Sequence, residues 1–240
     1  MQWTAEILQR FSPEKSEDAL FTSLLEVAPA LGYEYCSITT LVRCPFYHAR
    51  AYKRNNYPRE GNNFYTRESL ICRDLLRDNS LLVQTPQLWD EQLFTGHRAL
   101  WQYYQTYGVR HGVSQTVHGS DGVSSVLSLA RRREAISATE LDEQASDIVW
   151  LANLMHNALA PRVAQLARCQ LRGRAARAGL SNRELEVLKL TAKGMTSTRV
   201  AKVLRLTERT VNFHVASCVH KLGACNKLSA VVKATMGGLI

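Results

Sequence analysis

Residues 180–222 read LSNRELEVLKLTAKGMTSTRVAKVLRLTERTVNFHVASCVHKL, and they decide the fold of the C-terminal part of the chain. Ser181 and Glu184 have the spacing of a capping box, which predicts that a first helix begins there. Residues 197–204 predict a second short helix. Thr207 is suited to cap the amides that open a third helix. We therefore expect three short helices separated by tight turns.

The third of these helices leaves Arg209, Asn212 and Phe213 off its apolar face. The major groove admits one helix whose side chains reach base edges, so this pattern predicts a helix-turn-helix in which those three residues face bases. A trihelical bundle with a solvated polar face is the alternative. We assign further DNA-contacting roles, chiefly to phosphates, to Ser197, Thr198, Arg199, Thr207, Thr210, Ser217 and Lys221.

The charge of the chain is distributed unevenly between its two parts. Residues 161–240 contain 15 Lys and Arg against 3 Asp and Glu, a balance of +12. Residues 1–160 contain 15 against 18, a balance of −3, so the net +9 arises entirely in the last third. This asymmetry favours double-stranded DNA as the partner of the C-terminal part.

Five segments of the C-terminal part carry a family resemblance: residues 180–188 (LSNRELEVL), 192–194 (AKG), 206–214 (LTERTVNFH), 221–224 (KLGA) and 238–240 (GLI). In these segments the chain resembles the DNA-binding domain of the LuxR-type quorum-sensing transcriptional regulators. The resemblance implies an all-α domain of four helices that binds an inverted-repeat promoter site as a homodimer. It also implies that the fourth helix, residues 230–236, contributes to dimerisation.

The N-terminal part alternates helical and strand-like segments. Helical periodicity covers residues 17–31, and a capping box at Ser137 predicts a long helix to about Ala167, part of which we expect to pair with a second copy. Strands are expected at 33–42, 47–53, 113–118 and 123–129, and helices at 69–82 and 94–107. The arginine-rich residues 168–179 have no apolar period and indicate a linker, either merely solvated or contacting phosphates.

A spaced set of residues extends the resemblance to the N-terminal part. The family pattern is Trp, Tyr, Asp-Pro, Trp and Gly. At that spacing the chain has Gly61, Tyr65, Asp74 with Leu75, Trp89 and Gly112, so that four of the six positions agree. The resemblance implies an α/β/α sandwich whose antiparallel sheet encloses an N-acyl homoserine lactone. The expected fold is therefore α+β, with an autoinducer-binding domain (1–168), a linker (169–179) and a helix-turn-helix domain (180–240).

The resemblance assigns the polar atoms of such a ligand to particular side chains. Each buried amide or carbonyl needs a hydrogen-bond partner, since an unpaired one costs about 1–3 kcal/mol. Asp74 would accept from the amide N–H, Tyr65 would donate to the acyl carbonyl, and Trp89 would pack on the lactone ring. The remaining residues that we assign to the ligand site are Ser37, Tyr57, Trp101 and Ser128.

Among the positions at which the chain differs from the family pattern, Gly61 has the largest consequence. The family tryptophan at this place donates its indole N–H to the lactone carbonyl, and Gly61 has no side chain to do so. Loss of the hydrogen bond and of an aromatic wall together costs about one to a few kcal/mol. The alternative function is therefore a LuxR-type regulator that acts without ligand or senses a non-lactone signal.

Other classes of protein are not favoured. Cys72, Asp74 and the histidines at 111 and 118 lack the spacing of a nucleophile, base and orienter, so we expect no enzyme. No metal-ligand spacing or cofactor motif is evident, and the six single cysteines indicate reduced thiols. With neither a secretory signal nor a long apolar segment, we expect a cytoplasmic protein with no membrane partner.

Overall fold

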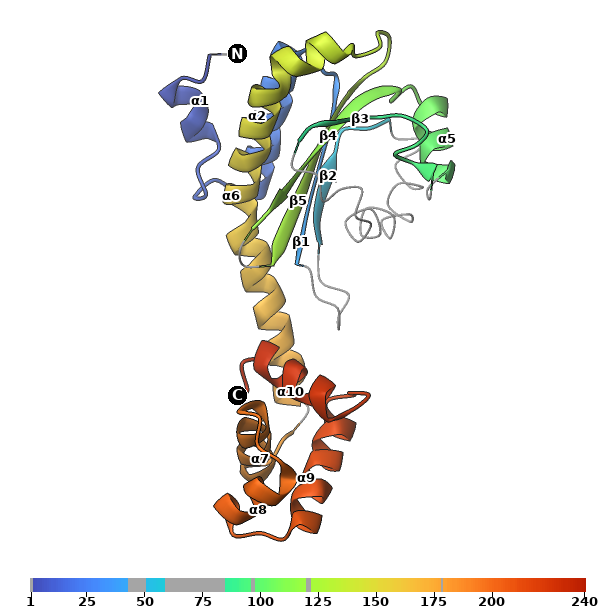
Figure 1. Ribbon diagram of the computed structural model, residues 1–240. Coiled ribbons are helices and arrows are strands. Elements are labelled where there is room, and N and C mark those ends of the chain that lie inside the picture. Colours follow the sequence, from blue (N-terminus) through green and yellow to red (C-terminus); the bar gives the residue numbers. More distant parts are fainter. Residues whose placement is uncertain (1, 43–50, 59–84, 96–97, 120–121, 178) are drawn as a thin grey trace. The chain divides into compact units, whose positions relative to one another are not determined.

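The computed structural model describes residues 2–42, 51–58, 85–95, 98–119, 122–177 and 179–240. The chain forms two compact units, Met1–Ala164 and Gln165–Ile240 (Figure 1). The first unit combines a sheet with helices, and the second is helical. The expected α+β class is confirmed.

The first unit is built on a five-stranded sheet in the order β2-β1-β5-β4-β3, in which every pairing is antiparallel. Its strands are β1 (Tyr35–Val42), β2 (Ala51–Asn55), β3 (Gln87–Leu88), β4 (His111–His118) and β5 (Val123–Arg131). β4 and β5 form the hairpin predicted from the sequence. β3 lies at the edge and has only two residues, too few to show an alternating pattern.

Helices cover both faces of this sheet, as Figure 1 shows. The helices of the unit are α1 (Ala5–Arg10), α2 (Glu17–Val27), the 3-10 helix η1 (Ala28–Leu31), α5 (Arg98–Thr106) and the start of α6 (Ala138–Arg177). α2 and α6 pack on one face through a core that includes Leu24, Ile38, Leu127, Leu151 and Met155. α5 lies over the opposite face and contributes to a separate aromatic core.

A short polar chain crosses the otherwise apolar interface between α6 and the sheet. The hydroxyls of Thr40 and Ser125 lie 2.8 Å apart, and the Ser125 hydroxyl lies 2.8 Å from Nδ1 of His156. All three side chains are buried. Because these groups are hydrogen-bonded to one another, both hydroxyls and the His156 ring can be buried in the core without an unsatisfied polar atom among these contacts.

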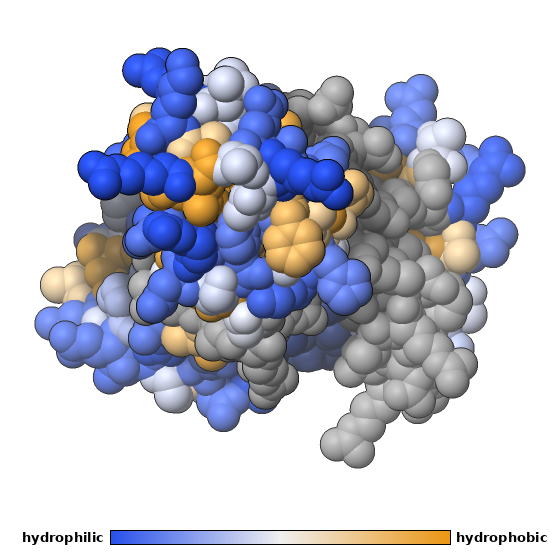
Figure 2. All heavy atoms as spheres, turned by 90° about the horizontal axis from the view of Figure 1, so that it is seen from below, coloured by the Kyte–Doolittle hydropathy of each residue, from blue (hydrophilic) through white to orange (hydrophobic). Residues whose placement is uncertain are grey.

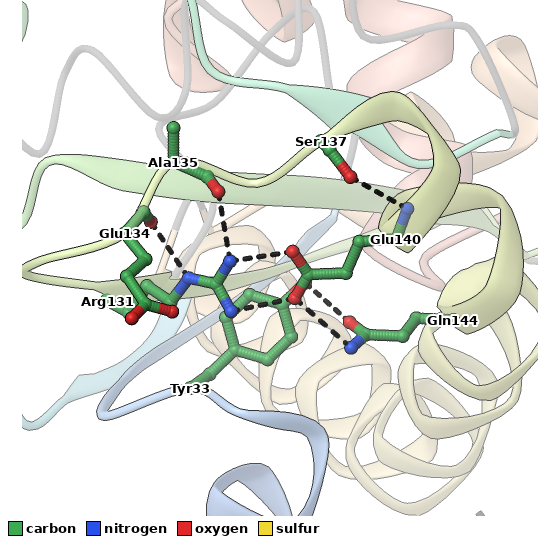
Figure 3. A network of polar contacts seen from close by, with 7 residues as sticks. All are labelled: Tyr33, Arg131, Glu134, Ala135, Ser137, Glu140 and Gln144. Atoms are coloured by element: carbon green, nitrogen blue, oxygen red, sulfur yellow. Dashed lines mark hydrogen bonds and ion pairs between the residues drawn. The ribbon is translucent and has the colours of Figure 1, made fainter.

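The start of α6 is fixed to the end of β5 by an ion pair (Figure 3). Arg131 donates from both terminal nitrogens to the two carboxylate oxygens of Glu140, each at 2.7 Å, and also to the carbonyl oxygens of Glu134 and Ala135. Ser137 accepts from the Glu140 amide, so half of the predicted capping box forms while the Glu140 carboxylate pairs with Arg131. The hydrogen bonds from Arg131 lower the pKa of Glu140.

α6 is longer than the sequence analysis predicted. It has 40 residues, contains Pro161, and continues to Arg177 rather than ending near Ala167. The expected linker is therefore helical over nearly its whole length. Residues 168–177 are rich in Ala, Leu, Gln and Arg, which are good helix formers, so the backbone stays helical without an apolar period.

The second unit adds four helices after α6, namely α7 (Asn182–Ala192), α8 (Ser197–Leu204), α9 (Glu208–Lys221) and α10 (Lys227–Met236). Val187, Val200 and Val211 form one core between α7, α8 and α9. Leu188 and Cys218 pack with the alanines of α10 in a second. The predicted four-helix domain is confirmed. None of the described helices is both long and apolar enough to span a membrane.

Candidate functional sites

The sheet face that looks away from α2 and α6 carries a row of serines. Ser37 pairs with Ser128 across β1 and β5, and Ser128 pairs with Ser114 across β5 and β4. The Ser114 and Ser128 hydroxyls lie 2.9 Å apart. We call Ser37, Ser128 and Ser114 the serine row. Two of its members, Ser37 and Ser128, are site residues predicted from the sequence, whereas Ser114 was not.

An aromatic cluster adjoins the serine row. Trp89 donates its indole N–H to the Ser114 hydroxyl at 2.7 Å and stacks on Tyr104 at 4.5 Å between ring centroids. Tyr57 meets Tyr104 edge to face at 5.8 Å. Trp101 is half-buried and stacks on Phe94, which in turn contacts Trp89. The structure thus brings Trp89, Tyr57 and Trp101, all predicted from the sequence, into one cluster.

The backbone of Gly112 holds Trp89 against the sheet. The Trp89 amide donates to the Gly112 carbonyl at 2.8 Å. A Cβ at position 112 would lie 2.5 Å from atoms of the Trp89 indole, closer than any real van der Waals contact. Glycine is therefore required here because the indole passes directly over the strand. This gives a physical reason for the glycine of the spaced set.

Beyond the serine row lies a second row of Thr39, Val126 and Thr116, which pair across the same three strands. Thr116 is 2% exposed, and its hydroxyl has no hydrogen-bond partner among the residues that the structure describes. An unsatisfied buried hydroxyl costs about 1–3 kcal/mol, and a polar atom of a ligand would satisfy it. The alternation of β4 places Thr116 on the face of Ser114, a signal that the sequence analysis did not use.

Three of the predicted ligand-contacting positions, Gly61, Tyr65 and Asp74, lie outside the described residues. Their roles stay predictions. The residues that the structure does describe define a buried sheet face with hydroxyls in two rows and aromatic rings at one end. Such a face suits a small molecule that has both polar and apolar parts.

In the second unit, α8 and α9 are joined by a tight turn at Arg205, whose φ of 55° is left-handed. The Thr207 side chain caps α9 by accepting from the Thr210 amide at 3.1 Å. Arg209, Asn212 and Phe213 are exposed on α9, and Phe213 is 70% exposed. The pair has the form of a helix-turn-helix with a polar outer face.

Two of the residues predicted to contact DNA, Ser217 and Lys221, form an internal network in this structure. Ser217 donates to Oε1 of the buried Glu184 carboxylate at 2.6 Å, and Lys221 donates to Oε2 at 2.9 Å. The Ser181 amide also donates to Oε2, which completes the predicted capping box. Burial alone would raise the pKa of Glu184, but these hydrogen bonds hold it at about 2.

The three remaining predicted contacts lie in the first turn of α8. Ser197 is half-buried, whereas Thr198 and Arg199 are exposed. Thr198 donates to a Glu208 carboxylate oxygen at 3.0 Å. Figure 2 views the chain from the side of α8 and α9, where its described surface is largely hydrophilic, interrupted by scattered hydrophobic side chains. All of these contacts to DNA stay predictions.

Fold and sites define a class of protein, one that joins a small-molecule-binding α/β unit to a helix-turn-helix unit. Residues 16–159 match the family model of the autoinducer binding domain, and residues 178–234 match that of the bacterial regulatory proteins of the luxR family. The chain therefore belongs to the LuxR family of quorum-sensing transcriptional regulators. These proteins are regulators and not enzymes.

Individual relatives agree over the whole chain. The transcriptional activator protein AnoR of Acinetobacter nosocomialis is 30% identical over 240 residues, which cover 99% of each chain. The crystal structure of Escherichia coli SdiA superposes with a TM-score of 0.65 at 26% identity, covering 98% of this chain and 96% of SdiA. SdiA in complex with octanoyl-rac-glycerol gives 0.64 at the same identity, covering 100% and 98%.

The contact between Gly112 and Trp89 leads to the first prediction. Gly112→Ala should destabilise the first unit by about 1–3 kcal/mol, because the added methyl group overpacks the indole. The thermal unfolding midpoint and the tryptophan emission of the full chain measure the effect. In a Trp89→Leu background the same substitution should cost much less, and an unchanged cost there would contradict the proposed contact.

The Glu184 network leads to a second prediction. Its depressed pKa contributes stability above the unfolded value near 4.3, and this contribution is lost as the pH falls toward about 2. Glu184→Gln should therefore destabilise α9 by about 2–3 kcal/mol at pH 7 and by much less near pH 2. Hydrogen exchange of the α9 amides in the full chain measures both values.

Glu186→Gln is the matched control, because Glu186 forms an exposed ion pair with Arg183 on the same helix. We expect this control to change the protection of α9 by less than about 1 kcal/mol at either pH. Equal effects of the two substitutions would show that the buried network contributes nothing specific.

Proposed function

We propose that this regulator binds an N-acyl homoserine lactone or a related amphiphile on the hydroxyl-bearing sheet face. We further propose that it binds an inverted-repeat promoter site as a cytoplasmic homodimer. The observation that carries the ligand proposal is the buried hydroxyl of Thr116, which no described residue pairs and which lies beside the serine row and Trp89. Ligand binding would stabilise the folded regulator by mass action and so raise the population competent to bind DNA.

Chemical complementarity supports this ligand class. An N-acyl homoserine lactone presents two carbonyls and one N–H, and a monoacyl glycerol presents one ester carbonyl and two hydroxyls. The rows of hydroxyls offer donors and acceptors to either along the strand direction. Thr116 is two residues from Ser114, about 7 Å along the strand. Polar atoms at the head group and at the start of the acyl chain can therefore reach different rows. The aromatic cluster supplies a flat apolar wall for a ring.

A second candidate ligand is an acylated molecule without a lactone ring. Gly61 stands where the family has the tryptophan that serves the lactone carbonyl. The relative SdiA has been solved with octanoyl-rac-glycerol, whose head group is an open-chain glycerol. Both observations favour a head group with hydroxyls instead of a ring, and the two candidates differ in how they respond to a restored tryptophan.

The test measures the thermal stability of the full chain with octanoyl homoserine lactone and, separately, with octanoyl glycerol. A ligand at about 100 times its dissociation constant should stabilise the protein by about 2.7 kcal/mol. Thr116→Val should stabilise the free protein by removing an unpaired hydroxyl, and should reduce the stabilisation by ligand. If it leaves the response to both ligands unchanged, Thr116 is not in the site.

Gly61→Trp separates the two candidates. It should strengthen the response to the lactone and weaken that to the glycerol ester if the natural signal has no lactone ring. Thr22→Val, at an exposed threonine of α2 that lies outside the sheet face, serves as the control for the general effect of replacing threonine by valine. A chain that responds to neither ligand, as purified or with Gly61→Trp, would contradict the proposed sensing function.

Dimerisation is supported by an uncharged stripe on the outer side of α6. Trp150 is 47% exposed, and Asn157 and Pro161 follow it at helical spacing on the same side. A large exposed aromatic residue on such a stripe is typical of an anchor at a protein interface. A second copy of the chain would bring the same stripe against itself about a twofold axis.

Trp150→Glu should raise the dissociation constant of the dimer at least tenfold, since it places a charge in the centre of the interface. Sedimentation velocity of the full chain, with and without octanoyl homoserine lactone, measures this. Trp150→Phe keeps an aromatic ring and should remain mostly dimeric. A dimer equally stable in all three proteins would show that this stripe is not the interface.

A further inference from the structure

Phe213 is an apolar side chain that the core of its own unit does not use. It is 70% exposed, whereas Val211, Val215 and Cys218 fill the buried side of the same helix. Its ring meets the His214 ring edge to face, at 5.9 Å between centroids, and it belongs to none of the core clusters of the described residues. α9 therefore packs completely without Phe213, and the reason for a large aromatic residue at this position lies outside the folded unit.

The charge around Phe213 indicates what covers it. On α9, Arg209 lies one turn before it, and Asn212 precedes it directly, both exposed. The last 80 residues of the chain, which include α9, carry a net charge of +12. Apolar partners are disfavoured on so basic a surface, while a polyanion with an accessible apolar group is favoured. Double-stranded DNA meets both requirements, because its major groove exposes the methyl group of thymine.

We propose that Phe213 recognises the 5-methyl group of one thymine in each half-site of the promoter element. The proposal rests on the proposed entry of α9 into the major groove. On the major-groove edges of the bases, this methyl group is the largest apolar group that an aromatic ring can contact, and most other specific contacts there are hydrogen bonds. Arg209 and Asn212 supply hydrogen bonds to neighbouring base edges, and Phe213 adds the methyl contact.

The experiment uses deoxyuridine, which lacks only this methyl group and pairs like thymine. Duplexes bound by the full chain are first selected from a pool with a random 20-base-pair centre, with and without octanoyl homoserine lactone. The thymines of the recovered site are then replaced singly by deoxyuridine. Removing the contacted methyl group should weaken binding about three- to tenfold at one position in each half-site.

Phe213→Ala should bind the parent duplex more weakly and should show no further loss at that position. Phe213→Leu, which keeps an apolar side chain, should retain part of the thymine preference. Val203→Ala is the matched control, since Val203 is an equally apolar, 54% exposed residue on α8. The control should keep the full deoxyuridine effect.

Three results would overturn the proposal. One is a site in which no thymine methyl group matters. Another is a deoxyuridine substitution that weakens binding equally in the parent chain and in Phe213→Ala. The third is a Phe213→Ala chain that binds every duplex normally but loses transcriptional output, which would assign Phe213 to a protein partner. Recovery of no preferred duplex would instead overturn the proposed DNA-binding function itself, and this inference with it.

Discussion

A β-strand turns successive side chains to opposite faces, and the whole first unit depends on this constraint. On β5, Leu127 and Leu129 face α2 and α6. The alternate residues, Val126 and Ser128, face the aromatic cluster. One set of strands therefore serves two purposes. It supplies half of an apolar core and, without any further element, a floor of hydroxyls for a small molecule. A one-residue slip in register would exchange the two faces and destroy both.

In the second unit, the arrangement of the helices depends on a single carboxylate, that of Glu184. Glu184 lies at the start of α7, and its partners Ser217 and Lys221 lie on the last turns of α9. The network joins the first helix of the unit to the helix that presents Arg209, Asn212 and Phe213. Ser217 and Lys221 thus position α9 rather than simply standing free on its surface. Removing Ser217 or Lys221 would leave the buried Glu184 carboxylate with fewer partners, whereas removing Glu184 would free an exposed Lys221.

Local signals made much of this architecture predictable from the sequence. The caps at Ser181 and Thr207 placed α7 and α9 to within a residue, because a capping box or a capping threonine is a short-range interaction. Contacts between distant residues could not be predicted in this way. Nothing near Glu184 reveals that its partners lie 33 and 37 residues later, and nothing near Trp89 reveals the strand beneath it.

The length of α6 was missed for a related reason. An amphipathic pattern reports which residues pack, whereas the helix continues beyond its packed part on intrinsic propensity alone. Sequence reasoning therefore ended α6 near Ala167, where the apolar pattern ends, and not at Arg177. The candidate ligand site was predicted only through a family pattern. The alternation of β4 would have added Ser114 and Thr116 from physical reasoning alone.

The two strongest functional candidates share one property, which is that each violates a rule of stability. Thr116 buries a hydroxyl without a partner, and Phe213 exposes an aromatic ring to water. Neither residue is needed to form the fold, because β4 and α9 contribute other residues, such as Val113 and Val211, to the apolar cores. Such residues lower the stability of the folded chain. Binding would offset this cost, because a ligand oxygen or a thymine methyl group would supply the missing contact. Under both proposals, the unsatisfied residue, more than the best-packed one, is where this regulator meets its partners.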